Sequence, residues 1–312
     1  MHKIYGHDAI IQRLVRSINL NKTDRAWIFS GISGIGKATI AYRFAAYIIA
    51  ETSTVDLDPD NILSIFSMVQ NGTHPDFFTI DNELETATME DYRNIVAKLY
   101  KKPVLSNHRV LLINDAEKLN INIFNALLKL FEEPPHNTAI IMITDNSDVI
   151  PATLKSRCAC LNFMPLSFEN IRKAIAELNE QITDTEIAIS NGSIGDAIRL
   201  KGDQMYTKYL QAISGRHINI PEYNINEDWW KLKKYIIRYL TVALNLSLKI
   251  DCDLSESEKK LIHQYDADNL AKTAHEIMKM MSLTDSMQLD KSTFLRWHLE
   301  QLSLLRSGFE SK

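Results

Sequence analysis

Residues 31–39 have the sequence Gly31-Ile32-Ser33-Gly34-Ile35-Gly36-Lys37-Ala38-Thr39, which contains the phosphate-binding pattern G-x-x-x-x-G-K in full. In such a loop the glycines let backbone N–H groups surround phosphate oxygens, and the lysine reaches the outer phosphates. A serine or threonine normally follows the lysine and binds the Mg²⁺ that bridges the β- and γ-phosphates. Ala38 has no oxygen for this purpose. The sequence therefore predicts a phosphate-binding loop that lacks one magnesium ligand.

The residues around the loop support this interpretation. An apolar run, residues 26–29, precedes the loop and is typical of a buried strand. Residues 38–49 follow it with apolar side chains at helical spacing, so the order is strand, glycine loop and helix, as a phosphate-binding loop requires. Thr39 does not replace the missing hydroxyl, because one step along a helix turns a side chain by about 100°. The alternative is a glycine turn that contacts no phosphate.

The first half of the chain alternates strand-like apolar runs with amphipathic helices, which is typical of a parallel α/β sheet with flanking helices. We therefore expect an α/β P-loop domain over residues 1–165. The five strands that we expect are residues 26–30, 77–80, 110–113, 139–144 and 159–163.

The remainder has helical patterns and no further strand pattern. We expect a small helical lid over residues 166–205 and an all-α domain over residues 206–312. Trp229, Trp230 and Trp297 are expected in its core or at a subunit contact, because few basic residues accompany them. The expected helices are residues 168–178, 186–190, one that begins near 192, and then 229–246, 255–281 and 291–305.

The composition excludes several classes of protein. The chain has 312 residues, of which 45% are hydrophobic and 24% charged, and its net charge of −4 gives no overall attraction to nucleic acid or anionic membrane. The first residues lack the apolar core of a signal peptide and no apolar run reaches transmembrane length, so we expect a cytoplasmic protein without membrane contact. Three cysteines are too few for a four-cysteine zinc site, and we expect Cys158 and Cys160 to line the core.

A nucleotide-hydrolysing site also needs an acidic residue at the end of a strand, to hold Mg²⁺, and often a second one to activate water. The candidate segment is residues 110–117, Val-Leu-Leu-Ile-Asn-Asp-Ala-Glu. If Asn114 occupies the metal position, its neutral amide binds Mg²⁺ poorly. If Asp115 occupies it, Ala116 follows and no base is present. Both registers predict that hydrolysis at this site is impaired.

Arg157 is the other candidate for catalytic chemistry. It lies in a short turn just before the last expected strand. An arginine fixed there can project as a charged finger. The alternative is an ordinary surface arginine that pairs with a nearby carboxylate, and the spacing alone favours this alternative.

Four segments together resemble the clamp-loader subunits of bacterial DNA polymerase III, which are AAA+ proteins. They occur in the family's order over roughly residues 4–200. The last two segments together are a more specific signal of the family than the phosphate loop alone. The segments are Gly31–Thr39, Thr73-His74-Pro75-Asp76, Asn125-Ala126-Leu127-Leu128-Lys129-Leu130-Phe131-Glu132-Glu133-Pro134-Pro135 and Ser156-Arg157-Cys158.

The resemblance implies an AAA+ domain, a lid and a helical collar domain, and a place in a hetero-pentamer with gamma/tau motor subunits and a delta subunit. That ring loads a sliding clamp onto primed DNA. With Ala38 and Asn114 in place, the implied role is that of the non-hydrolysing subunit type, in which Arg157 acts in trans on the ATP of a neighbouring motor. The candidate nucleotide contacts, which are vestigial in this role, are Gly31, Gly34, Gly36, Lys37, Thr39, Asp115 and Thr144.

Two departures from the family pattern bear on this role. Motor subunits place a γ-phosphate-sensing arginine in the lid helix, where this chain has Gly195. The family's four-cysteine zinc module is missing, since residues 51–72 contain no cysteine, so we expect no structural metal. No cofactor is expected to be required, and ATP or ADP could still bind without hydrolysis, with its adenine near Gly6 and His7. The alternatives are an active ATPase that uses Thr39 and Asp115, and a nucleotide-binding switch.

Overall fold

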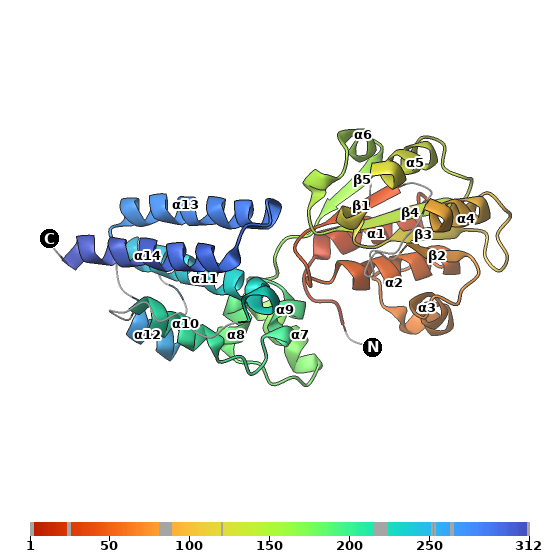
Figure 1. Cartoon of the computed structure of the whole chain (residues 1–312). Coiled ribbons are helices and arrows are strands. Elements are labelled where there is room, and N and C mark those ends of the chain that lie inside the picture. The colour runs from red at the N-terminus through yellow and green to blue at the C-terminus, as the bar shows by residue number, and fades with distance from the viewer. Residues whose placement is uncertain are drawn as a thin grey trace. The chain divides into compact units, whose positions relative to one another are not determined.

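The computed structural model describes residues 3–23, 26–80, 89–119, 121–214, 224–250, 252, 254–262 and 265–310. The chain forms two compact units (Figure 1). The first consists of Met1–Glu180 with Gly192–Asp196, and the second of Gln181–Asn191 with Ala197–Lys312. The division into three domains at residues 165 and 205 stays a prediction.

The first unit is built on a five-stranded parallel sheet with the strand order β2-β3-β4-β1-β5. All five expected strands are confirmed to within one residue at each end. Helices cover both faces of the sheet, so successive residues of a strand are buried on either side. For this reason the strands could be predicted from continuous apolar runs in the sequence. The strands are β1 (Ala26–Ser30), β2 (Phe77–Ile80), β3 (Arg109–Ile113), β4 (Thr138–Thr144) and β5 (Cys158–Asn162).

Alternate residues of each strand point to opposite faces, and each face has its own core. Trp27 and Phe29 of β1 pack with α1, α2 and α3, whereas Ala26 and Ile28 pack with α4, α5 and α6. Figure 1 shows these two helical layers on either side of the sheet. The helices of this unit are α1 (Asp8–Asn19), α2 (Lys37–Ala50), α3 (Leu63–Gln70), α4 (Met89–Leu99), α5 (Ile121–Glu132), α6 (Ala152–Lys155) and α7 (Phe168–Glu177), with short 3₁₀ turns η1 (Pro59–Ile62), η2 (Ala116–Lys118) and η3 (Ser147–Val149).

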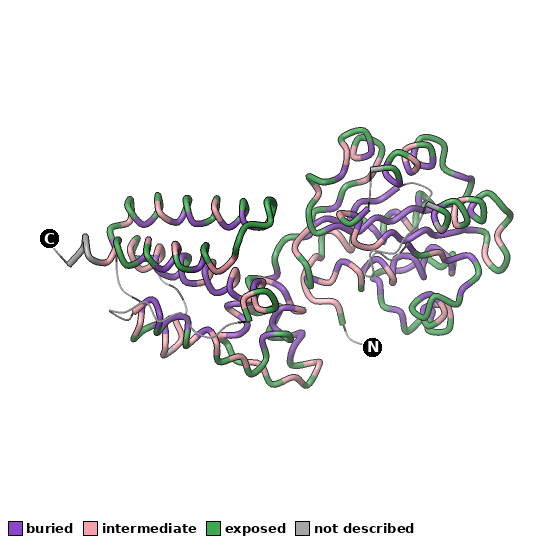
Figure 2. The backbone as a smooth tube through the Cα atoms, viewed as in Figure 1, coloured by how far each residue is buried: buried purple, intermediate pink, exposed green. Residues whose placement is uncertain are grey.

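The second unit is helical, as expected for the C-terminal part of the chain. Purple buried segments run along its helices in Figure 2. Trp229 is buried in its core, and Trp230 and Trp297 pack against that core, which confirms the core assignment. No helix in the described part of the chain is long and apolar enough to cross a membrane. The helices are α8 (Asp184–Ile189), α9 (Ile194–Arg199, which begins in the first unit), α10 (Met205–Ser214), α11 (Ile225–Ser247), α12 (Glu256–Leu261), α13 (Ala267–Ser286) and α14 (Lys291–Glu310).

Two expectations differ from the structure. The helix expected over residues 255–281 is two helices, because the carboxylate of Asp266 accepts a hydrogen bond from the Asn269 N–H and starts α13 anew; residues 263 and 264 of that range lie outside the described residues. The expectation that both cysteines of β5 line the core is wrong for Cys160, which is exposed. β5 is the edge strand of the sheet, so its side chains are covered less completely than those of the central strands.

A buried carboxylate holds the loop between α4 and β3. Asp76 is fully buried and accepts hydrogen bonds from the backbone N–H groups of Val104 at 2.7 Å, Leu105 at 2.7 Å and Ser106 at 3.0 Å. Burial alone would raise the pKa of Asp76, but these three donors and the neighbouring His74 outweigh it and hold the pKa below its usual value. Asp76 of the Thr73–Asp76 motif thus has a structural role.

Replacing Asp76 tests this role. Asp76→Asn removes the negative charge and turns an NH₂ group toward backbone donors, so we expect a loss of about 2–4 kcal/mol in the free energy of unfolding at pH 7. Because the pKa is lowered in the folded chain, the stabilisation by Asp76 is present above the unfolded pKa of about 3.9 and is lost as the pH falls through the folded value. Urea unfolding at several pH values should show that the free energy of unfolding of the variant falls less steeply as the pH is lowered. An equal free energy of unfolding at pH 7 and an equal dependence on pH would contradict the assignment.

Candidate functional site

The phosphate loop lies at the carboxyl end of β1 and connects this strand to α2, as its pattern predicts. Ile35 anchors it in the core with 1% of its surface exposed. Gly36 has a φ of +100°, in the left-handed region that favours glycine, and its carbonyl accepts the N–H of Ile40 at 3.1 Å. The loop therefore leads directly into the N-terminus of α2, where free backbone N–H groups favour an anion.

Lys37 occupies the inside of this loop. Its Nζ donates to the carbonyl of Gly31 at 2.7 Å and that of Ile32 at 2.8 Å, and it forms an ion pair with Asp145 Oδ1 at 2.7 Å. The lysine side chain is 5% exposed. An ammonium group has three N–H donors, and the chain's own oxygens use all three. A phosphate group must break at least one of these bonds to reach Lys37.

The two residues after the lysine point in different directions. Ala38 is half-buried and packs against the core, while Thr39 is exposed. The hydroxyl of Thr39 therefore does not stand where a hydroxyl at position 38 would stand. The loss of one magnesium ligand at the start of α2 stays a prediction.

The carboxyl end of β4 contributes the groups next to the loop. Thr144 is fully buried, and its carbonyl accepts the N–H of Gly31 at 3.3 Å. Its hydroxyl donates to the Asn146 carbonyl at 2.9 Å and accepts the Asn146 N–H at 3.1 Å, so it shapes the turn after β4. Asp145, which is 42% exposed, is the residue that contacts the lysine. Asp145 was not among the site residues expected from the sequence; its position directly after a strand was the available signal.

The carboxyl end of β3 lies one strand further along the sheet. Asn114 continues the sheet, since its N–H donates to the Ile80 carbonyl at 2.9 Å. Asp115 has a φ of +47° and pairs with Lys118 Nζ at 2.8 Å. Glu117 Oε2 accepts the N–H of Asp145 at 3.2 Å. Asp115, the acidic residue expected at this site, thus has an ion-pair partner within the chain, and Glu117 is joined to the loop through Asp145.

Two further segments lie against the loop. The Gly195 N–H donates to the Gly34 carbonyl at 3.0 Å, and a Cβ added at Gly195 would lie 2.9 Å from Gly34 Cα. The His7 Nε2–H donates a hydrogen bond to the Ile35 carbonyl oxygen at 3.1 Å, and its ring packs edge-to-face on Phe163. Because a carbonyl only accepts, the His7 ring donates here. Burial lowers the pKa of His7, which favours the neutral ring.

Arg157 lies in the turn between α6 and β5. Its Nη1 donates to the Thr153 carbonyl at 2.8 Å, and its Nη2 pairs with Glu132 Oε1 at 3.1 Å. The arginine side chain is 40% exposed and that of Glu132 is 50% exposed. The structure thus shows a surface ion pair, which the spacing favoured, and a guanidinium that remains accessible.

The strand register separates Arg157 from the loop of its own chain. β1 and β5 are parallel, with Ala26 beside Cys158 and Ser30 beside Asn162. Arg157 precedes the first residue of β5, whereas the loop follows the last residue of β1. At 3.3 Å a residue, the two positions are about 20 Å apart along the strand direction, because one lies at the amino ends of the strands and the other at their carboxyl ends. This distance exceeds the reach of an arginine side chain.

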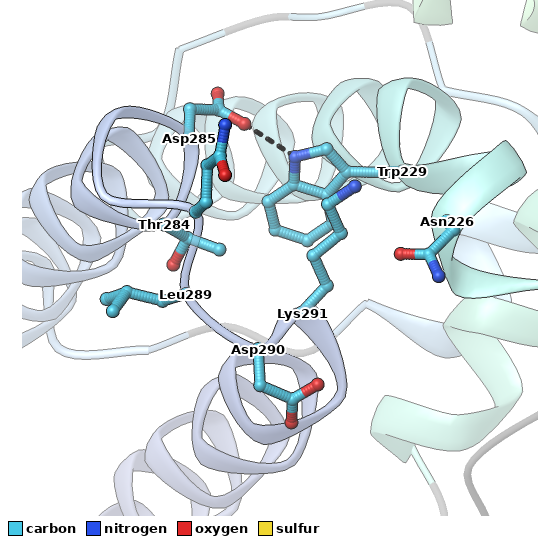
Figure 3. Close-up of a pocket in the computed structure, with 8 residues that line it drawn as sticks. Asn226, Trp229, Thr284, Asp285, Leu289, Asp290 and Lys291 are labelled. Atoms are coloured by element: carbon cyan, nitrogen blue, oxygen red, sulfur yellow. Dashed lines mark hydrogen bonds between the residues drawn. The ribbon is translucent and has the colours of Figure 1, made fainter.

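A pocket in the helical unit does not add to the site. It lies where α11, α13 and α14 meet (Figure 3). The Trp229 Nε1–H donates to Asp285 Oδ1 at 2.6 Å, and Lys233 Nζ contacts Asp285 Oδ2 at 2.9 Å. The Asp285 carboxylate, one of two at this pocket, is thus paired within the chain. In the described part of the chain, no group of three or more His, Cys, Asp or Glu side chains is placed to hold a metal ion.

Comparisons with known proteins identify relatives of this chain. A family model described as "DNA polymerase III, delta subunit" matches residues 6–167. "DNA polymerase III subunit gamma" of Buchnera aphidicola subsp. Schizaphis graminum is 32% identical over 212 residues, which are 65% of this chain and 58% of the relative. "DNA polymerase III subunit delta'" of Pseudomonas aeruginosa is 29% identical over 196 residues, 61% of this chain and 60% of the relative. The chain thus spans about three fifths of the length of these curated relatives.

A solved structure of a DNA polymerase III, gamma subunit-related protein from Thermotoga maritima is similar at a TM-score of 0.41 and 14% identity. The match covers 95% of this chain and 98% of that chain. The family model spans the sheet and its helices, including the phosphate loop and Arg157.

Gly195→Ala tests the close packing of the α9 start on the loop. At an open helical position, alanine would stabilise a helix by about 1 kcal/mol relative to glycine. Here the new Cβ overlaps Gly34, which costs about 1–3 kcal/mol, so we expect a lower melting temperature. Thermal unfolding followed by circular dichroism shows whether the melting temperature falls or rises. A melting temperature equal to or above that of the unchanged chain would contradict the contact.

Proposed function

The chain belongs to the DNA polymerase III delta-subunit family, and we propose that it is the delta-prime subunit of the clamp loader, which does not hydrolyse ATP itself. In this role it supplies Arg157 to the ATP site of a neighbouring motor subunit while the sliding clamp is loaded onto primed DNA. The observation that carries the proposal is the strand register, because Arg157 lies about 20 Å from the loop of its own chain. A nucleotide that contacts Arg157 must therefore be held by another subunit.

The state of the chain's own loop supports the non-hydrolysing role. All three donors of Lys37 are used inside the chain, Ala38 offers no magnesium ligand, and Asp115 is paired with Lys118. Gly195 stands where a motor subunit would carry its sensing arginine, and its contact with Gly34 leaves no room for a side chain. Each of these features removes a group that phosphoryl transfer requires.

The accessibility of Arg157 supports the second half of the proposal. A guanidinium carries five N–H donors in a planar fork that matches phosphate oxygens. Within the part of the chain that the structure describes, two of its nitrogens, Nη1 and Nη2, have protein partners. The remaining donors can serve a phosphate group presented by another subunit.

The proposed partners are gamma/tau motor subunits and a delta subunit in a cytoplasmic hetero-pentamer, with the clamp and primed DNA contacted through the complex. DNA contacts would go to phosphates and not to base edges. We propose that no cofactor is required and that ATP or ADP in the chain's own loop is bound without turnover. The nucleotide contacts proposed from the sequence are unchanged: Gly31, Gly34, Gly36, Lys37, Thr39, Asp115 and Thr144.

One observation favours an alternative. Relatives named gamma subunit match this chain at 32% identity, so an active motor subunit is the second candidate. It would require Thr39 and Asp115 to hold magnesium in a shifted geometry, and the structure has Thr39 exposed and Asp115 ion-paired. ATP turnover by the purified chain distinguishes the two candidates.

We expect ATP hydrolysis by the purified chain at the level of the buffer blank. Ala38→Thr should not raise it, because a hydroxyl at position 38 changes neither the ion pair of Lys37 nor that of Asp115. Release of inorganic phosphate under steady-state conditions is the measurement. Should the unchanged chain turn over ATP, Lys37→Ala shows whether its own loop is responsible; a rate that disappears in this control would establish the motor alternative.

In a loader reconstituted with clamp and primed DNA, Arg157→Ala should lower ATP hydrolysis at the motor site that this chain completes by about 10³-fold or more. The melting temperature of the isolated chain should change little, since the half-exposed ion pair with Glu132 contributes little to stability. Lys155→Ala is the matched control, because it removes another charge from the end of α6, whose ion pair among the described residues is with the exposed Asp148. If Arg157→Ala leaves hydrolysis intact in an assembled complex, the trans role is wrong.

A further inference from the structure

The last two of the four sequence motifs meet in space. Glu132 is the last residue of α5, in the motif that ends with Glu133-Pro134-Pro135, and it pairs with Arg157 of the Ser156–Cys158 motif at 3.1 Å. The two residues are 25 positions apart in the sequence and come from different elements. Each motif thus contributes one half of a single ion pair.

The position of Glu132 is unusual for a helix. The C-terminus of a helix carries partial negative charge and favours basic side chains, yet α5 ends with one carboxylate and Glu133 follows it. Choices that oppose a local preference are found where function requires them. The last turn of α5 contains Lys129, and pairing with Arg157 places a second positive charge at the end of the helix, beside Glu132.

The backbones that carry the pair are fixed relative to each other. Leu130 and Phe131, just before Glu132, are buried, and Leu154 of α6, three residues before Arg157, is fully buried in the same core. The Arg157 N–H also donates to the Leu154 carbonyl at 3.0 Å. Any movement left to the arginine is therefore movement of its side chain.

The contacts restrict that side chain without covering it. Glu132 holds Nη2 and the Thr153 carbonyl holds Nη1, so the guanidinium plane is fixed at two points. Among the described residues, Nε and one N–H on each Nη have no partner, so these donors remain available to a phosphate. A catalytic group that is held in one orientation loses less freedom when the reaction begins.

We propose that Glu132 is a positioning residue for Arg157: it holds the guanidinium in the orientation that reaches the phosphates of a nucleotide bound by the neighbouring subunit. This inference rests on the proposed function, because it has meaning only if Arg157 acts in trans. Glu132 does not contact the nucleotide and acts through Arg157 alone. An exposed pair of this kind contributes little to folding, so its removal should affect the reaction and not the fold.

The experiment uses the full chain in a reconstituted loader with clamp and primed DNA. Glu132→Ala should lower kcat for ATP hydrolysis about tenfold and leave the KM for ATP unchanged, since orientation matters in the transition state. Glu132→Gln, which keeps an acceptor oxygen without the charge, should lie between Glu132→Ala and the unchanged chain. Glu133→Ala is the matched control, because it removes the adjacent exposed carboxylate, and it should behave as the unchanged chain.

A double variant separates positioning from other effects. If Glu132 acts only through Arg157, the rate of Glu132→Ala with Arg157→Ala should equal that of Arg157→Ala alone. A further loss in the double variant, a rate for Glu132→Ala equal to that of Glu133→Ala, or a rate increase would each overturn the inference while leaving the trans role of Arg157 intact. If Arg157→Ala itself has no effect, the proposed function fails, and this inference fails with it. Equal melting temperatures for all variants exclude a folding defect.

Discussion

Lys37 brings a positive charge into a site where its side chain is almost fully buried, and the chain neutralises that charge with its own groups. An unpaired charge in such a place would cost several kcal/mol, so the carbonyls of Gly31 and Ile32 and the carboxylate of Asp145 determine the shape of the loop. This is possible only because β4 lies beside β1 in the sheet, which brings the residue after β4 next to the loop that follows β1. The same bonds stabilise the loop and use the donors of Lys37, so a nucleotide phosphate that reaches Lys37 must replace at least one of them.

Much of the first unit could be predicted from the sequence, for a definite physical reason. The central strands are buried on both faces, so they are continuous apolar runs such as that of β4, and the glycine pattern marks the turn after β1. The strand order could not be predicted, because sequence order does not determine which strands are neighbours. For this reason Asp145 was not identified, although Thr144 beside it was. The contact of Gly195 with Gly34 joins residues 161 positions apart, and no local pattern indicates it.

The errors in the prediction also have a physical cause. Cys158 and Cys160 do point to the same side of β5, but β5 is an edge strand, and only the first of them is half-buried. Alternation along a strand gives the direction of a side chain and not the extent of its cover. The partner of Arg157 could not be predicted either. The spacing did not show that this partner is Glu132, which belongs to the motif at residues 125–135. The interpretation as a surface ion pair and the interpretation as a finger describe the same side chain, since a paired guanidinium keeps free donors.

Parallel strands explain how one domain can take part in two nucleotide sites. The loop and its acidic neighbours lie together at the carboxyl ends of β1, β3 and β4. Arg157 lies just before the amino end of β5, at the opposite ends of the strands. The two ends share no described side-chain contact and are joined by strands that are rigid because both faces are packed. The absence of a hydroxyl at Ala38 therefore has no direct route to Arg157. Under the proposed function, a chain of this topology can lose the chemistry of its own loop and keep the group that it would offer to a neighbour.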